Sequence, residues 1–112
     1  MSHTLRVFKK DDAKGVKELI LTVLAKEYPF DRSAYSDSDL DKINEVYGTD
    51  KDSFFVIDED GEIVGTVGIK GETKDDALLR RLFVDLKHRK KGYGTELLAR
   101  AIDSAGQKDI NA

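Results

Sequence analysis

The chain has 112 residues, a length typical of a single domain with a modest hydrophobic core. Charged residues make up 37% of it and give a net charge of -3, a balance that argues against a nucleic-acid-binding domain. The absence of cysteine excludes disulfides, thiol catalysis and thiolate zinc sites. No apolar run is long enough to span a membrane and no signal-peptide pattern begins the chain, so we expect a cytoplasmic protein without a membrane partner.

The N-terminal segment has a strand pattern followed by a helix pattern. Residues 4–8 (TLRVF) alternate and predict a short strand. Asp11 and Asp12 are residues that often start a helix. The apolar residues of this helix recur at the spacing of one face: Val16, Leu19, Ile20, Val23 and Leu24.

An aromatic loop and a shorter helix are predicted next. The loop is rich in ring-bearing residues and holds the only proline: Tyr28, Pro29, Phe30, Asp31 and Tyr35. A residue of the stretch 37–39 (DSD) can cap the second helix, and Gly48 can end it. The apolar side of that helix consists of Leu40, Ile43, Val46 and Tyr47.

The pattern changes to strands at residue 53. Two β-rich runs, SFFVI and EIVGTVGI, are joined by a segment that contains Asp60-Gly61, which is a strong signal for a hairpin. A third strand is predicted at Ala77–Val84, apolar except at Arg80 and Arg81, and therefore central in a sheet. From Thr95 onward one helical face carries Leu97, Leu98, Ala101, Ile102 and Ala105, and Gly106 is a plausible C-terminal cap.

The segment RKKGYG (residues 89–94) joins the third of these strands to the last helix. The first amides of a helix have no partner within the helix and lie at the positive end of its dipole. Gly92 and Gly94 lack the Cβ atoms that would keep an anion away from those amides. The segment of residues 89–94 is neither a Walker loop nor a dinucleotide fingerprint. A glycine pair alone can simply permit a tight turn. Its place between a strand and an amphipathic helix favours a diphosphate cradle.

The stretch LLRRLFVDLKHRKKGYGTELLARAI resembles motif A of the GCN5-related N-acetyltransferase (GNAT) superfamily. In that motif a strand is followed by Arg or Gln, two residues, Gly, one residue, and Gly or Ala, and then by a helix. Residues 89–94 match all six positions, and the upstream segments are similar in order and spacing to bacterial members. The resemblance implies a mixed α/β (α+β) GNAT-like acyl-CoA N-acyltransferase fold. Its expected order is strand, helix, helix, three antiparallel strands, helix, in a single domain over residues 1–112.

The family likeness also implies a site for acetyl-CoA as cosubstrate. The strand backbone would bond the pantetheine arm, the loop amides would hold the diphosphate, and the basic side chains would face the phosphates. The implied cofactor-binding residues are Leu82, Phe83, Val84, Arg89, Lys90, Lys91, Gly92, Tyr93, Gly94 and Thr95. No metal is expected, because His3 and His88 lack partners at ligand spacing. We expect His88 to be an exposed side chain, although a phosphate contact is the alternative.

No catalytic residue can be named from the sequence. Leu78 stands where related sequences often place a glutamate, which is the general base in some members. The remaining nearby carboxylates are Glu72, Asp75, Asp76 and Asp85, and their spacing singles out none of them. The aromatic loop corresponds to a segment that often lines the acceptor side in the family, but its rings can equally pack against the sheet.

Family members continue beyond the last helix with a strand, a helix and two closing strands. Residues 106–112 (GQKDINA) read only as the approach to that strand, so Ala77–Val84 would be an edge strand that needs a cover. The candidates are a second copy in a homodimer, a complementing second chain, or the cofactor; a truncated or degenerate chain is also possible.

Two functions follow from the resemblance. The first is an acetyl-CoA-dependent N-acetyltransferase acting on an amine of a small molecule or peptide. The alternative is a non-catalytic acyl-CoA-binding or dimeric assembly module.

Overall fold

The computed structural model describes residues 3–27, 43–47, 52–71, 76–89, 91–106 and 109–111. Predictions about the aromatic loop, the residues 37–40, Gly48, Glu72, Asp75 and Lys90 lie outside these residues. The strands are β1 (His3–Val7), β2 (Ser53–Glu59), β3 (Glu62–Gly71), β4 (Asp76–Val84) and β5 (Asp109–Asn111). The helices are the 3-10 turn η1 (Lys10–Asp12), α1 (Ala13–Glu27), α2 (Ile43–Val46), the 3-10 turn η4 (Leu86–His88) and α3 (Tyr93–Ala105).

The described strands form one sheet in the order β1-β2-β3-β4-β5. The first four strands are antiparallel, and β5 runs parallel to β4. Asp60 and Gly61 both have positive φ angles, 54° and 92°, so the β2–β3 connection is the two-residue turn that the Asp-Gly pair predicted. The predicted order of elements is confirmed.

One strand of the sheet, β4, contains an irregularity that the sequence did not reveal. Thr66 pairs with Phe83 and Gly68 with Arg80, so two residues of β4 face one residue of β3. Arg81 lies in this bulge with a φ of 52°, which is uncommon for a residue other than glycine. The Thr66 hydroxyl, fully buried, donates a hydrogen bond of 2.8 Å to the Arg81 carbonyl and fixes the bulge from the neighbouring strand.

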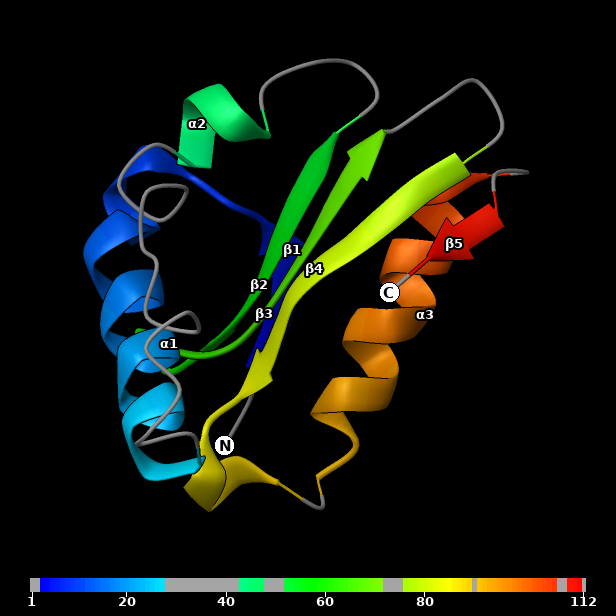
Figure 1. Cartoon of the computed structure of the whole chain (residues 1–112). Helices are drawn as coiled ribbons and strands as arrows, with labels where there is room; N and C mark the ends of the chain where they lie inside the picture. Colours follow the sequence, from blue (N-terminus) through cyan, green and yellow to red (C-terminus); the bar gives the residue numbers. More distant parts are fainter. Residues whose placement is uncertain are drawn as a thin grey trace.

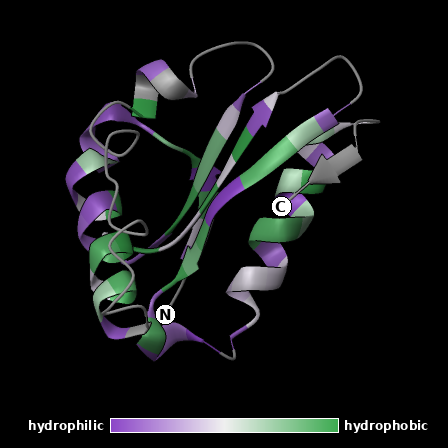
Figure 2. Ribbon diagram, in the orientation of Figure 1, coloured by the Kyte–Doolittle hydropathy of each residue, from purple (hydrophilic) through white to green (hydrophobic). Residues whose placement is uncertain are grey.

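Helices cover both faces of the sheet: α1 and α2 lie on one side and α3 on the other (Figure 1). Both α1 and α3 carry hydrophilic and hydrophobic residues (Figure 2). In an amphipathic helix, the helical spacing places these two kinds of residue on different faces. The first core cluster joins α1 and α2 to the sheet through Val16, Ile20, Leu24, Ile43, Tyr47, Phe54 and Val56. The second joins α3 to the sheet through Phe55, Ile57, Val64, Val67, Ile69, Ala77, Tyr93, Leu97 and Ala101.

The predicted apolar face of α3 is too wide. Leu97 and Ala101 are buried, but Leu98 is 37% exposed and Ile102 is 50% exposed. A helix on one face of a sheet buries only the stripe that touches the strands, and residues one position along the chain turn away by about 100°. The expected five-residue face therefore divides into a buried stripe and an exposed one.

The last described residues form a strand, whereas we expected residues 106–112 only to approach one. Asp109–Asn111 pairs in parallel with Asp76–Leu78, so β5 covers the start of β4. This part of β4 is therefore not an edge. Among the helices that the structure describes, none is long and apolar enough to cross a membrane.

Candidate cofactor-binding site

The candidate site is the connection from β4 to α3. Gly92 is the N-cap of α3 and has a φ of 82°, a left-handed conformation that glycine adopts without strain. Its carbonyl accepts the amide of Glu96 at 3.0 Å, which is the first hydrogen bond of the helix. A Cβ atom added at Gly92 would meet nothing within 4 Å, so the space outside the loop is open.

The amides at the start of α3 face no acceptor within their own helix. These are the amides of Tyr93, Gly94 and Thr95, at the positive end of a 13-residue helix. A Cβ atom at Gly94 would make only an ordinary contact, 3.8 Å from Cγ2 of Val84. Packing within the chain therefore does not require glycine at position 94. Two glycines beside unpaired amides and open space fit a bound phosphate group.

Two of the predicted basic residues lie beside this opening. Arg89 is exposed, and its Nε donates a long hydrogen bond of 3.4 Å to the Val84 carbonyl. The Nζ of Lys91 lies 3.5 Å from Oε1 of Glu59 and 5.9 Å from the centre of the Tyr93 ring. In this structure Lys91 thus faces a carboxylate of the chain, and its side chain is 40% exposed.

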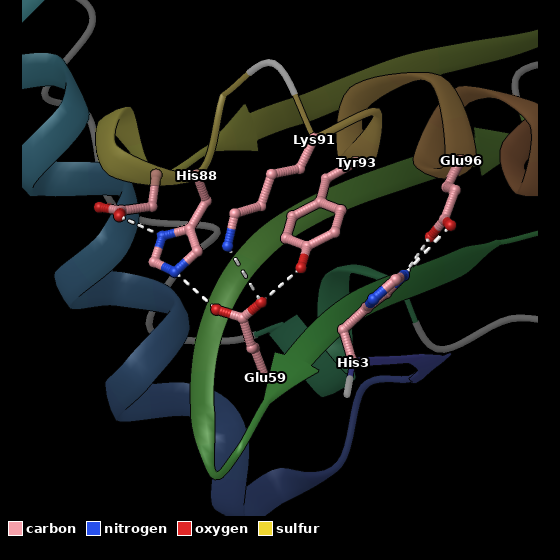
Figure 3. Close-up of polar contacts among 7 residues, drawn as sticks. His3, Glu59, His88, Lys91, Tyr93 and Glu96 are labelled. Carbon is pink, nitrogen blue, oxygen red and sulfur yellow. Dashed lines mark hydrogen bonds and ion pairs between the residues drawn. The ribbon is translucent and has the colours of Figure 1, made fainter. Parts of the chain in front are cut away.

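Glu59, which sequence reasoning missed, lies directly behind the loop (Figure 3). The Tyr93 hydroxyl donates a hydrogen bond of 2.5 Å to Oε1 of Glu59, and Nε2 of His88 lies 2.7 Å from Oε2. The other ring nitrogen of His88 lies 2.6 Å from Asp85. The expectation that His88 is exposed is wrong: its side chain is only 15% exposed, because it lies between these two carboxylates.

The hydrogen bond between Tyr93 and Glu59 sets the protonation of both groups. It lowers the pKa of Glu59, with help from the positive charge of Lys91, although burial acts in the opposite direction. The same bond raises the pKa of Tyr93 to about 12. At neutral pH the pair is therefore a phenol donating to a carboxylate. This arrangement is suited to holding a side chain in place rather than to transferring a proton.

β5 covers only the first residues of the outer edge of β4. β5 pairs only with Asp76–Leu78, so no described strand pairs with that edge from Leu79 to Val84. The predicted residues Phe83 and Val84 pack their side chains against the two core clusters, while Leu82 is 38% exposed. The backbone of residues 82–84 is thus held rigidly by packing, beside the loop.

No general base emerges from the described carboxylates. Asp85 is committed to His88 at 2.6 Å, and Asp76 stands at the opposite end of β4 from the loop. Among the described residues, no group of three or more His, Asp or Glu could hold a metal ion. The catalytic residues stay unassigned.

Comparisons with known proteins identify the family of the chain. Residues 18–112 match the model of the acetyltransferase (GNAT) family, and the chain belongs to this family. A probable N-acetyltransferase camello of Xenopus tropicalis is 41% identical over 61 residues, which cover 53% of this chain and 28% of that protein.

Solved structures show the same fold. A GNAT-family acetyltransferase of Staphylococcus aureus Mu50 superposes with a TM-score of 0.82 at 23% identity, covering 93% of this chain and 66% of that one. The PaiA N-acetyltransferase of Thermoplasma acidophilum, in complex with coenzyme A, gives a TM-score of 0.71 at 17% identity, covering 90% of this chain and 70% of that one. The chain thus spans just under two thirds of the Staphylococcus protein and less than a third of the Xenopus one.

Proposed function

We propose that this chain binds acetyl-CoA and takes part in the transfer of its acetyl group to an amine. The observation that carries the proposal is the open space at Gly92, where the unpaired amides at the start of α3 lie beside the free edge of β4. Membership of the GNAT family and the coenzyme A complex of the Thermoplasma relative support the choice of ligand.

Each part of the site has a role in this proposal. The amides of Tyr93, Gly94 and Thr95 hold the diphosphate, and Arg89, Lys90 and Lys91 add positive charge around it. The backbone of Leu82, Phe83 and Val84 bonds the pantetheine arm as a neighbouring strand would. Bound acetyl-CoA supplies a thioester whose acetyl carbon an amine can attack.

The bulge in β4 lies where the free edge begins to approach the loop. There the register of β4 against β3 shifts, with Thr66 opposite Phe83 and Gly68 opposite Arg80. In such folds an oxyanion formed at the thioester carbonyl needs fixed hydrogen-bond donors. Because the Thr66 hydroxyl donates to the Arg81 carbonyl, the backbone of the bulge is held in a fixed position.

The first experiment is a calorimetric titration of the chain with acetyl-CoA, with acetylpantetheine as the matched ligand that lacks the diphosphate. We expect micromolar binding of acetyl-CoA and far weaker binding of acetylpantetheine. Equal affinities would refute the diphosphate cradle, and no binding of either ligand by the folded chain would refute the proposed function.

Two further measurements separate the finer alternatives. Release of free thiol with a panel of amines tests transfer, and binding without turnover would instead support a non-catalytic acyl-CoA-binding or assembly module. Light scattering tests whether a second copy covers the free edge of β4 in a homodimer; a monomer would leave a complementing chain or acetyl-CoA as the cover.

A further inference from the structure

Glu59 touches both ends of the exposed segment that forms the candidate cradle. His88 and Tyr93 flank residues 89–92, and Arg89, Lys91 and Gly92 of that segment are exposed. Glu59 comes from a different part of the chain, the end of β2, and its side chain is 8% exposed. One carboxylate therefore contacts the residue before the segment and the residue after it.

We propose that Glu59 is a positioning residue for acetyl-CoA binding, which fixes the start of α3 by holding His88 with one oxygen and Tyr93 with the other. The identity of the ligand in this inference rests on the proposed function. The contacts by which Glu59 orders the start of α3 do not depend on it. Glu59 does not touch the ligand in this proposal. It acts through Tyr93, the first residue of α3, whose neighbouring amides form the cradle.

Two of the three contacts of Glu59 are short and shielded from water, while the contact with Lys91 is longer, at 3.5 Å. The Tyr93 hydroxyl donates at 2.5 Å, and Tyr93 as a whole is 4% exposed. The distance from Oε2 to Nε2 of His88 is 2.7 Å. Hydrogen bonds to a charged acceptor are stronger than neutral ones, and removing one partner of a buried pair leaves the other unsatisfied.

Neighbouring side chains hold the same arrangement. The rings of His88 and Tyr93 lie nearly parallel, with 6.3 Å between their centres, and the His3 ring packs against Tyr93 with 4.5 Å between the ring centres. Nδ1 of His88 contacts Asp85, so both of its nitrogens face carboxylates, and both contacts are hydrogen bonds when the ring is an imidazolium. His3 in turn contacts Glu96 in the first turn of α3 at 3.0 Å.

Gly92 itself has little packing around it that could hold the backbone. A Cβ atom at Gly92 would meet nothing within 4 Å, and the backbone there is in the left-handed region. A segment of this kind is usually mobile unless its ends are tied. Because Glu59 ties both ends, the amides of the cradle are ordered before the ligand arrives, and binding costs less conformational entropy.

The test combines three variants with a control. Glu59→Ala removes the contacts with His88, Tyr93 and Lys91, and Tyr93→Phe removes only the hydroxyl. Glu59→Gln keeps an oxygen for Tyr93 and an amide that can donate to a neutral His88. Glu62→Ala changes an exposed glutamate of the same hairpin and serves as the control. For each variant, hydrogen exchange of the Glu96 amide, the first hydrogen-bonded amide of α3, is measured without ligand, and Kd is measured for acetyl-CoA and acetylpantetheine.

We expect Glu59→Ala to accelerate amide exchange at the start of α3 and to raise the Kd for acetyl-CoA, each by about tenfold, while the Kd for acetylpantetheine stays the same. Tyr93→Phe should give a smaller change in the same direction. Glu59→Gln should stay close to the parent, and Glu62→Ala should match it.

Unchanged exchange and unchanged Kd in a folded Glu59→Ala variant would overturn the proposal. If that variant does not fold, the Tyr93→Phe variant decides: amide exchange and Kd equal to those of the parent would overturn the proposal. Faster exchange without a change in Kd would refute the role in ligand binding. Failure of the parent to bind acetyl-CoA would refute the proposed function, and amide exchange would still test whether Glu59 orders the loop.

Discussion

Replacing Gly92 with alanine should affect acetyl-CoA binding more strongly than it affects the stability of the fold. The added Cβ would meet no atom of the chain within 4 Å, so the variant has no steric clash to relieve. Its cost in the free chain is the left-handed backbone at a φ of 82°, which is about 1–2 kcal/mol for a residue with a Cβ. We therefore expect the melting temperature to fall by roughly 3–8 °C.

The same methyl group would have a larger effect on acetyl-CoA binding. It stands in the open space that the diphosphate occupies in the proposed complex, and pushes the phosphates away from the amides of α3. Losing even one charge-assisted hydrogen bond costs about 2 kcal/mol, which corresponds to a roughly 30-fold rise in Kd. Calorimetric titration of parent and variant at one salt concentration measures this ratio.

The matched control is Gly106→Ala at the other end of α3. Gly106 also has a positive φ, 67°, and an added Cβ there would also meet nothing within 4 Å. This variant should lose at least comparable stability and should bind acetyl-CoA like the parent. Equal Kd values for parent, Gly92→Ala and Gly106→Ala would show that nothing approaches Gly92 closely, and the cradle would be wrong.

Three other predictions test the fold and the site. Gly68→Ala should lower the free energy of unfolding by about 1–3 kcal/mol in denaturant titrations, because the Cβ would lie 2.8 Å from the Tyr47 ring; an unchanged midpoint would contradict that packing. Arg6 lowers the pKa of Asp12 through two hydrogen bonds of 2.7 and 2.9 Å, so the pair stabilises the fold at neutral pH. That stabilisation should vanish as the pH falls from the ordinary aspartate value of 3.8 through the lower native one, and Asp12→Asn should lose most of this acid dependence; parallel pH profiles would refute the pairing. Arg89→Ala should raise the Kd for acetyl-CoA by at most about fivefold, because exposed charges contribute little beside backbone amides, and complete loss of binding would mean that the side chain dominates.

Much of the fold follows from patterns that involve neighbouring residues. The alternation in the strands, the helical spacing in α1 and the Asp60-Gly61 turn all predicted elements that the structure contains. The resemblance at residues 89–94 likewise predicted the family to which the chain belongs. The wrong predictions concern how exposed individual side chains are. His88 was expected to be exposed, and Ile102 was expected to be covered, because a periodic pattern says nothing of how far the neighbouring layer extends.

The amino-acid order alone therefore indicates which segments are strands and helices, and it predicts which glycine-bearing connection is the candidate to accept an anion. These properties depend on backbone preferences and on periods of two or 3.6 residues. The contact between Glu59 and Tyr93 joins residues 34 positions apart, and the bulge at Arg81 depends on how β4 is registered against β3. Such features arise when the sheet and α3 pack together, because side chains distant along the chain then share one desolvated space. A pattern of neighbouring residues does not show which distant residues will come into contact.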